Sequence, residues 1–343
     1  MTDTVLRDPR SPLCLLACRD GAVLAQGVAD RLGTRVIPGE ELWFASGEAK
    51  YSVRENVRGC DCYVFQQPIV PGASGVHDAQ TTYDRLVAVL HAADALRHAD
   101  AARVTVVMPY LPGCRQDKRK DHAREGVSTG LFARMFAAAG VSMVITVDPH
   151  NESLVGAYDP VRCVLEAVSV AGPFSDFLAQ TGLVADVVAS TDVGGLELAR
   201  RYAHRLGKPI AALSKERDYS RPHTIAATTV IGEVSGRSVL IVDDIVDTAG
   251  SMESAVRALW EQGATDVVVA GVHLLLSGDG WARLHRLHAD AIAAGRTFRV
   301  ASTASVVHPT APDWMVSMPL EPLLADVIRS VNTRGSVRAL EHP

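Results

Sequence analysis

The stretch Val239-Leu-Ile-Val-Asp-Asp-Ile-Val-Asp-Thr-Ala-Gly-Ser-Met252 carries the clearest structural pattern in the sequence. Val239–Val242 is an apolar run of the kind found in buried strands of parallel sheets. Asp247–Ser251 consists of small and polar residues that suit a tight turn. Met252–Gln262 has apolar residues at helical spacing, and Gly263 is placed to end the helix. A strand, a turn and a helix in this order predict an α/β domain with a mainly parallel sheet.

The same alternation recurs through most of the chain. Further strands are predicted at Val104–Met108, Val141–Val147, Pro209–Ser214 and Val267–Val272, and a further helix at Ser128–Ala139. A length of 343 residues suits two domains of about 150 residues each. We expect an N-terminal domain over residues 1–160, a C-terminal domain over 161–320, and a helix and tail over 321–343 that return to the first domain.

The two halves resemble each other at a constant offset. Phe136–His150 aligns with Leu259–His273 without a gap, and Gly140 then matches Gly263, an offset of 263 − 140 = 123. An internal duplication explains this better than chance, although helix–glycine–strand units resemble one another in any α/β protein. We therefore expect both domains to share one topology.

The composition argues against several classes of protein. The chain is 48% hydrophobic and 21% charged, which is typical of a globular protein. Its formal net charge is −5 without a polybasic run, so no nucleic-acid partner is expected. The six cysteines lack C-x-x-C spacing, which argues against a zinc site or a disulfide scaffold. The apolar run near the N-terminus is too short for a signal peptide or a membrane span, so we expect a cytoplasmic protein without a membrane partner.

Asp243 and Asp244 end the predicted strand Val239–Val242, at the edge where open α/β sheets bind ligands. Two adjacent carboxylates can accept hydrogen bonds from a vicinal diol. The backbone N–H groups of Asp247–Ser251, at the start of a helix, suit a phosphate dianion. The pattern therefore predicts a site for a 5-phosphorylated ribose, with an acidic cap on a surface helix as the alternative.

Other polar clusters also follow predicted strands. Arg115–Asp117 offers a guanidinium and an amide that can stack on a nucleotide and neutralise its phosphates. Asp148–His150 and Asp192 offer a carboxylate or an imidazole near a metal ion and a triphosphate. Lys215–Arg217 is expected to begin a loop whose cations neutralise the charge of a phosphoryl-transfer reaction. Taken singly, each cluster also fits an exposed loop or a capping residue.

Together these residues resemble the ribose-phosphate pyrophosphokinase family, the phosphoribosyl pyrophosphate synthetases. The resemblance rests on eight segments in family order: Phe44–Glu48, Glu55–Gly59, Arg115–Asp117, Asp148–His150, Thr191–Gly195, Lys215–Arg217, Val242–Ser251 and Ser336–Leu340. It implies two duplicated, Rossmann-like domains of the phosphoribosyltransferase type. It also implies transfer of the β,γ-diphosphoryl group of Mg-ATP to the 1-hydroxyl of ribose 5-phosphate, giving phosphoribosyl pyrophosphate and AMP.

The resemblance further implies roles for individual residues. ATP would be bound by Phe44, Ser46, Glu48, Arg115, Gln116, Asp117 and His150. Ribose 5-phosphate would be bound by Asp243, Asp244, Asp247, Thr248, Ala249, Gly250 and Ser251. Mg²⁺ would be held at His150 and Asp192, and the catalytic cations would be Lys215 and Arg217. The family also implies a homo-oligomer built from dimers, with hexamers among its forms.

Several positions depart from the family pattern. Ser46 stands where the family usually has Asp or Asn, Pro149 replaces an apolar residue, and Asn56 replaces a common Ser. Pro68–Thr82 is longer and richer in glycine and proline than its family equivalent. The nucleotide preference, phosphate activation and the hexamer are therefore implied less directly than the chemistry. The alternatives are a type I phosphoribosyltransferase, a non-catalytic regulatory homologue, and the same transfer to another pentose phosphate.

Overall fold

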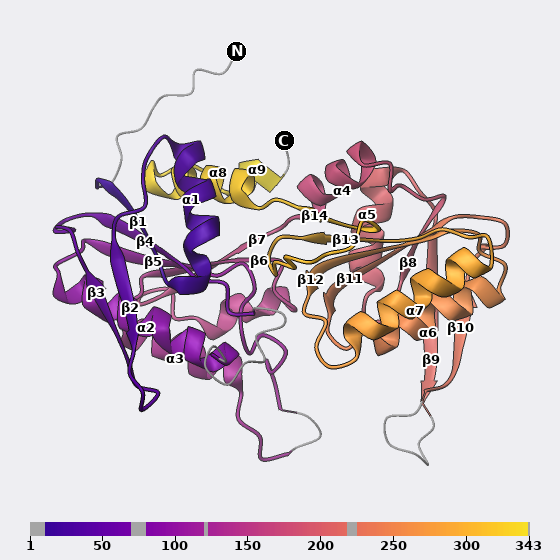
Figure 1. Cartoon of the computed structure of the whole chain (residues 1–343), viewed down its shortest axis with the longest axis horizontal. Coiled ribbons are helices and arrows are strands. Elements are labelled where there is room, and N and C mark those ends of the chain that lie inside the picture. Colours follow the sequence, from indigo (N-terminus) through magenta and orange to yellow (C-terminus); the bar gives the residue numbers. More distant parts are fainter. Residues whose placement is uncertain (1–10, 70–79, 120–122, 218–224, 342–343) are drawn as a thin grey trace. The chain divides into compact units, whose positions relative to one another are not determined.

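The structure, a computed structural model, describes residues 11–69, 80–119, 123–217 and 225–341 (Figure 1). These residues form two compact units. Unit 1 contains the described residues up to Ser169 together with those from Pro319 onward, and unit 2 is Val170–Met318. No helix within the described ranges is long and apolar enough to cross a membrane. None of the six cysteines forms a disulfide bond, and five of them are buried.

The sheet of unit 1 has five parallel strands in the order β1-β4-β5-β6-β7. They are β1 (Leu13–Ala17), β4 (Asp61–Phe65), β5 (Arg103–Val107), β6 (Met143–Val147) and β7 (Val164–Val168). Most of their apolar residues are buried because helices cover both faces, as is general for parallel sheets. A separate antiparallel hairpin consists of β2 (Gly39–Trp43) and β3 (Ala49–Val53).

Four long helices cover the sheet of unit 1. Figure 1 shows α1 (Ala22–Leu32) and α8 (Glu321–Asn332) side by side over one face, and α2 (Thr82–His98) and α3 (Ser128–Ala138) on the other. A capping box starts α2, because Thr81 and Asp84 each accept the other's backbone N–H. Shorter helical segments complete the unit: η1 (Arg19–Gly21), η2 (Glu152–Ala157) and α9 (Arg338–Glu341).

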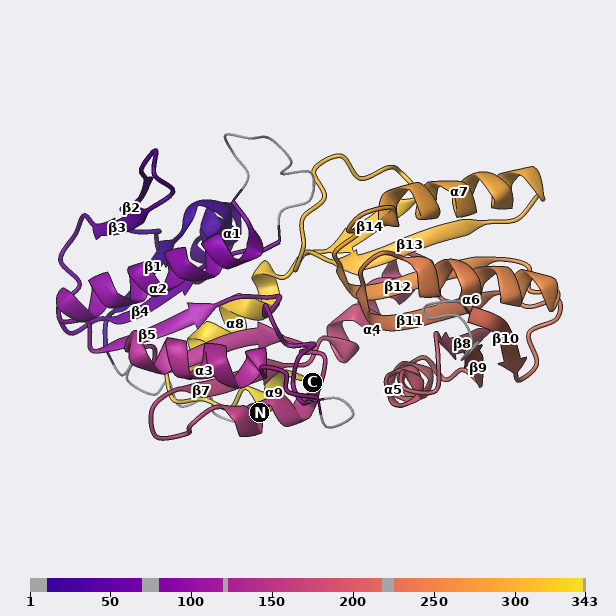
Figure 2. The same ribbon diagram turned by 90° about the horizontal axis from the view of Figure 1, so that it is seen from below.

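The sheet of unit 2 has seven strands in the order β10-β9-β8-β11-β12-β13-β14. They are β8 (Val187–Ser190), β9 (Ile210–Arg217), β10 (Ile225–Ile231), β11 (Val239–Val246), β12 (Val267–Leu274), β13 (Phe298–Thr303) and β14 (Met315–Met318). All neighbours run parallel except β9 and β10. One face carries α4 (Ala171–Gln180) and α5 (Leu196–Leu206), and the other carries α6 (Gly250–Glu261) and α7 (Gly280–Ala293) side by side (Figure 2).

The two units repeat one topology. In each, the first strand (β1 or β8) connects through a helix (α1 or α5) to a segment on its outer side. The chain then returns to a strand on the inner side, β4 or β11. The outer segment of unit 1 is a single bridge from Leu15 to Val36, at the place where unit 2 has β9. The equivalent pairs are therefore β1 and β8, β4 and β11, and β5 and β12.

The predicted offset of 123 residues is wrong by one repeat. It pairs β6 with β12, whereas β12 occupies the place of β5 in the sheet. Both α3 and α6 end next to a glycine, Gly140 or Gly263, and lead to an apolar strand. Helix–glycine–strand repeats from the two units can therefore resemble each other in sequence without being equivalent in the sheet.

The helix that follows the last strand of each sheet packs in the other unit. After β7 comes α4, which packs on α5 in unit 2, and after β14 comes α8, which packs on α1 in unit 1. Asn332 at the end of α8 donates from Nδ2 to Oδ2 of the buried Asp61 in β4 at 2.9 Å. Unit 1 is therefore built from both ends of the chain.

Two strands are longer than the sequence pattern predicts. β11 continues through Val246 and pairs there with β12, whereas its pairing with β8 ends at Val242. β9 continues to Arg217 in an antiparallel pair with β10. Charged residues remain in strand conformation at both places because the neighbouring backbone satisfies their N–H and C=O groups. In α3, Phe132 and Phe136 are buried, whereas Leu131 is 47% exposed.

Candidate active site

The carboxyl end of the unit 2 sheet has a reversal of strand order between β8 and β11. The chain leaves β8 toward β9 on one side and later returns to β11 on the other. Open α/β sheets bind ligands at such a switch point, because the diverging connections leave a crevice at the strand ends. Asp192, which follows β8, and the pair Asp243 and Asp244 in β11 lie at this point.

Short polar contacts hold the acidic pair. The hydroxyl of Thr191 donates to Asp243 Oδ2 at 3.1 Å, and the backbone N–H of Asp244 donates to Asp243 Oδ1 at 3.0 Å. Burial, and secondly the negative charge of Asp244, raise the pKa of Asp243 to about 8. A carboxyl group in such surroundings gains from a ligand that brings hydroxyl donors, as a sugar diol does.

The turn Asp247–Ser251 leads from β11 into α6. Ala249 caps the helix with a φ of 56°. This left-handed conformation costs a residue other than glycine about 1 kcal/mol or more. The first N–H groups of any helix have no partner within that helix, and its N-terminus attracts anions. The backbone of this turn therefore suits a phosphate group.

Asp192 stabilises the loop between β8 and α5. Its Oδ1 accepts the backbone N–H of Gly195 at 3.1 Å, just before the helix begins. A Cβ at Gly194 would lie 3.2 Å from the same oxygen, which a larger residue would crowd. The carboxylate is thus placed at the switch point by a contact with its own loop.

Lys215 and Arg217 belong to β9, which corrects the expectation that they lie in a loop. Lys215 pairs with Thr228 and Arg217 with Ile225, both in β10. The antiparallel partner satisfies the backbone here, so the strand does not stop at the apolar run. Residues 218–224, over which the expected loop would continue, lie outside the described residues.

In unit 1 the structure brings together two of the predicted ATP-binding segments. Arg115–Asp117 follows β5, and Asp148–His150 follows β6, its neighbour in the sheet. Asn151 Nδ2 donates to Asp117 Oδ2 at 2.7 Å and so links the two segments. The arginine and the histidine of these segments are exposed at this edge. The arrangement leaves a cation and an imidazole accessible to a nucleotide.

Phe44, Ser46 and Glu48 form the tip of the hairpin β2–β3. The backbone N–H of Phe44 donates to the Glu48 carbonyl at 2.8 Å, and Ser46 Oγ donates to Glu48 Oε2 at 3.1 Å. Figure 1 shows the tip extending away from the body of unit 1. The Phe44 ring is 48% exposed. The tip therefore carries a half-exposed aromatic ring.

Comparisons with known proteins agree with this arrangement. The N-terminal domain of ribose phosphate pyrophosphokinase matches residues 13–140, and the phosphoribosyl transferase domain matches residues 174–287. The chain is 33% identical over 344 residues to the ribose-phosphate pyrophosphokinase of Mycobacterium tuberculosis, with 97% of each chain covered. The chain belongs to the ribose-phosphate pyrophosphokinase family. It is also 30% identical to the Bacillus subtilis enzyme of that name, with 92% of this chain and 93% of the relative covered.

A solved structure supports the same conclusion. The crystal structure of phosphoribosylpyrophosphate synthetase from Mycobacterium smegmatis matches with a TM-score of 0.80 and 30% identity, covering 94% of this chain and 100% of that chain. The duplicated α/β fold and the pyrophosphokinase function are thereby confirmed. A type I phosphoribosyltransferase would account for residues 174–287 alone. The pyrophosphokinases match both units, so the chain is an enzyme of the transferase class.

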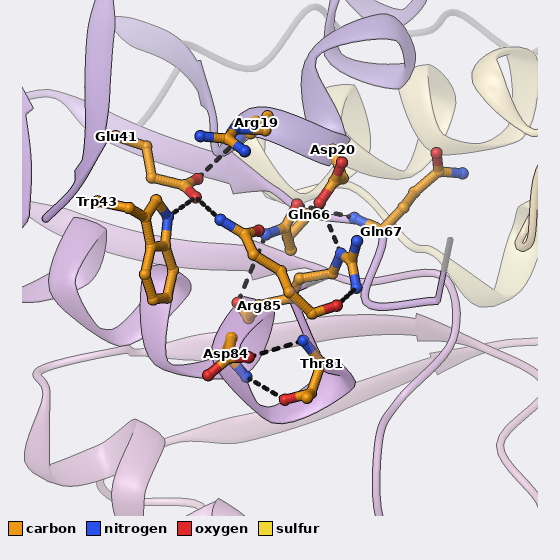
Figure 3. Close-up of polar contacts among 10 residues, drawn as sticks. Arg19, Asp20, Glu41, Trp43, Gln66, Gln67, Thr81, Asp84 and Arg85 are labelled. Carbon is orange, nitrogen blue, oxygen red and sulfur yellow. Dashed lines mark hydrogen bonds and ion pairs between the residues drawn. The ribbon is translucent and has the colours of Figure 1, made fainter. Parts of the chain in front are cut away.

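The pyrophosphokinase fold has an equivalent switch point in unit 1, between β1 and β4, and its chemistry differs (Figure 3). Asp20 follows β1 as Asp192 follows β8, but its Oδ2 accepts from Nε of the buried Arg85 at 2.6 Å. The buried amides of Gln66 and Gln67 follow β4. An internal cation and two amides therefore occupy the place at which unit 2 has its acidic pair.

The hairpin β2–β3 is fastened to this same edge of unit 1. Oε1 of Glu41 accepts from Nε1 of Trp43 at 2.6 Å and from Nε2 of Gln80 at 3.3 Å. Its Oε2 accepts the backbone N–H of Arg19 at 2.8 Å, and Figure 3 shows these contacts converging on one carboxylate. The pyrophosphokinase hairpin therefore has a rigid base beneath its exposed tip.

The described residues could bind Mg²⁺ only together with water and substrate phosphates, which would supply most of its ligands. Across the described ranges, no group of three or more His, Cys, Asp or Glu side chains is placed to hold a metal ion. Asp192 offers the carboxylate oxygen that Mg²⁺ prefers, whereas the nitrogen of His150 is a weaker ligand for it. Mg²⁺ usually takes one or two carboxylates and completes its shell with water and substrate phosphates. The residues present fit such an ion.

Sequence reasoning missed three residues of this pyrophosphokinase site. Thr191 and Asn151 adjoin predicted residues in the sequence, but they contact Asp243 and Asp117, which are 52 and 34 residues away along the chain. Arg283 in α7 donates from Nη1 to the backbone carbonyl of Thr248 at 2.8 Å across a separation of 35 residues. No local pattern could have indicated these three contacts.

Proposed function

We propose that the enzyme transfers the β,γ-diphosphoryl group of ATP to the 1-hydroxyl of ribose 5-phosphate, giving phosphoribosyl pyrophosphate and AMP. The observation that carries this proposal is the acidic pair at the switch point of unit 2, followed directly by the turn into α6. Asp243 and Asp244 accept hydrogen bonds from the ribose diol, and the backbone of Asp247–Ser251 binds the 5-phosphate. One segment then holds both ends of the sugar and leaves its 1-hydroxyl for the reaction.

The proposed step is an in-line displacement at the β-phosphorus of ATP. The oxygen of the sugar 1-hydroxyl bonds to that phosphorus and loses its proton to solvent. The bond from the β-phosphorus to the oxygen that bridges it to the α-phosphorus breaks, and that oxygen leaves on AMP. Such a displacement needs positioning and charge neutralisation rather than a covalent intermediate.

The residues of unit 1 supply the proposed ATP site. Arg115, Gln116, Asp117 and His150 bind the nucleotide, with the link from Asn151 to Asp117 as support. Lys215 and Arg217 are the proposed catalytic cations, which neutralise the charge that develops on the transferred group. We thus assign ATP to an N-terminal domain and ribose 5-phosphate to a C-terminal one.

Mg²⁺ is the proposed cofactor, and when bound it neutralises the charge of the β- and γ-phosphates. Asp192 and His150 are its proposed protein ligands. Asp192 is supported by its place at the switch point beside the acidic pair. Water and phosphate oxygens would supply the other ligands.

A homo-oligomer built from dimers is proposed for the active form. Its support is the exposed Phe44 at the ordered hairpin tip, which with Ser46 and Glu48 would complete the nucleotide site of a neighbouring subunit. A hydroxyl at Ser46 is shorter than the acid or amide typical of the family, so we expect weaker selection for adenine. We also propose that the enzyme is cytoplasmic. Its proposed substrates, ATP and a sugar phosphate, and its six free cysteines fit that compartment.

The reaction can be tested by product analysis. Purified protein is incubated with Mg-ATP and each of several pentose 5-phosphates, and the products are identified by mass spectrometry. AMP and phosphoribosyl pyrophosphate should form only with ribose 5-phosphate. Pyrophosphate released from phosphoribosyl pyrophosphate on adding a nucleobase would instead support a phosphoribosyltransferase. No AMP with any pentose phosphate would overturn the proposed reaction.

A further inference from the structure

Arg283 reaches the phosphate turn from a helix that is distant in sequence. Its Nη1 donates to the Thr248 carbonyl at 2.8 Å, and its Nε lies 3.5 Å from Oε2 of Glu253 in the first turn of α6. The side chain is only 28% exposed. The helix α7 itself begins against the turn, since a Cβ at Gly280 would lie 2.9 Å from the Asp247 carbonyl oxygen.

We infer that Arg283 is a positioning residue, which orients the peptide between Thr248 and Ala249 so that its N–H points into the phosphate site. The C=O and N–H of a trans peptide point in opposite directions. Because Arg283 holds the Thr248 carbonyl, the N–H of Ala249 must point away from α7. The inference rests on the proposed binding of a sugar phosphate at this turn.

The turn needs such support because its backbone is strained. Ala249, with its φ of 56°, is 4% exposed and precedes the first residue of α6. A left-handed residue other than glycine persists only where its surroundings hold it in place. A bond from a guanidinium to the adjoining carbonyl opposes rotation of that peptide.

Gly250 makes room for the guanidinium. A Cβ at Gly250 would lie 2.9 Å from Arg283 Nη1. The φ of Gly250 is not positive, so the backbone conformation alone does not require glycine here. A side chain at position 250 would therefore have to displace the Arg283 guanidinium from its present position.

Arg283 also balances a charge that would oppose phosphate. Glu253 lies in the first turn of α6, where its carboxylate stabilises the helix but repels a bound anion. Arg283, Arg257 and Arg286 lie 3.5, 3.1 and 3.8 Å from its carboxylate oxygens. Of the three, Arg283 contacts the turn itself, so Arg286 provides a control with the same charge on the same helix.

The test compares Arg283→Met, Arg283→Lys and Arg286→Met in the full-length protein. Calorimetry measures ribose 5-phosphate binding without ATP, and steady-state assays give kcat and both KM values. Arg283→Met should weaken ribose 5-phosphate binding and raise its KM about tenfold, with the ATP KM unchanged and kcat altered less than about threefold. Arg283→Lys should recover part of the loss because it keeps a donor. Arg286→Met should stay within about twofold of the wild type.

The outcomes separate this inference from the proposed function. Ribose 5-phosphate binding by Arg283→Met at wild-type strength would overturn the positioning role, and so would an equal loss in Arg286→Met. Absence of ribose 5-phosphate binding in the wild type would contradict the proposed function first. If thermal unfolding shows Arg283→Met to be misfolded, Gly250→Ala displaces the guanidinium with Arg283 intact. Gly250→Ala and Gly250→Ser should both show the same tenfold loss of ribose 5-phosphate binding. Normal binding by both variants would overturn the inference.

Discussion

The raised pKa of Asp243 makes the stability of the unliganded protein depend on pH. Burial, followed by the charge of Asp244, raises its pKa to about 8, whereas an unfolded aspartate titrates near 3.9. Between these values the native state binds more protons than the unfolded state. The free energy of unfolding therefore falls as pH rises through this window, and the loss is complete above the native pKa.

Asp243→Asn should remove this pH dependence. We expect the wild type to lose about 4 kcal/mol of unfolding free energy between pH 5 and pH 9, since the native pKa lies about three units above pH 5 and each unit corresponds to about 1.4 kcal/mol. The variant should be nearly level over the same range. Urea denaturation of the unliganded protein at several pH values measures both slopes, and equal slopes would contradict the assignment.

Lys215→Ala should lower kcat by about 10²- to 10³-fold, as expected for loss of one group that stabilises developing charge. Ribose 5-phosphate binding should change little, because the sugar is assigned to β11 and the turn. Asp244→Ala should have the opposite profile, with weaker sugar binding as its main effect. Stopped assays measure kcat and calorimetry measures ribose 5-phosphate binding, so together they distinguish the two variants. Lys208→Ala, before the other end of β9, is the control, and near-normal turnover of Lys215→Ala would refute its catalytic role.

At the level of elements, α2 and the segment after β1 are joined by an ion pair at the switch point of unit 1. Arg85 and Asp20 are 5% and 18% exposed, so removing one partner leaves a poorly hydrated charge. Arg85→Met should reduce the free energy of unfolding by about 3 kcal/mol. The double variant Asp20→Asn with Arg85→Met should recover most of that loss.

Chemical denaturation of unit 1 measures this effect. The control is Arg162→Met in the same unit, whose partner is Asp159 and whose pair is 76% and 51% exposed, and it should cost less than about 1 kcal/mol. Equal effects of the two single variants would show that the pair at the switch point does not stabilise the fold.

For the whole molecule, the return of α8 makes unit 1 depend on the end of the chain. Leu324, Val327 and Ile328 of α8 are fully buried, and Asn332 bonds Asp61. Each such apolar side chain contributes about 1.5–3 kcal/mol on burial, and a whole domain is stable by about 5–15 kcal/mol. Losing α8 therefore removes a large part of the stability of unit 1.

Truncation after Met318 should abolish the cooperative thermal transition of unit 1 and leave that of unit 2 within a few degrees of its normal value. Calorimetry with hydrogen exchange assigns the transitions to their units. Truncation after Ser336 retains α8 and removes α9, and should have little effect on either transition. If unit 1 of the shorter chain melted as in the full-length protein, α8 would not be part of its core.

The sequence by itself determined the class of fold, the family and the acidic pair with its turn, because each depends on residues within one strand, one turn or one helix. The sequence pattern predicted β9 and β11 to end too early, because pairing with β10 and β12 decides where those strands stop. Tertiary structure alone decided which strands are equivalent and that Arg283 reaches the turn. The physical reason is distance along the chain: periodicity and turn chemistry act over a few residues, whereas sheet order and the contact of Arg283 with Thr248 join segments that only folding brings together.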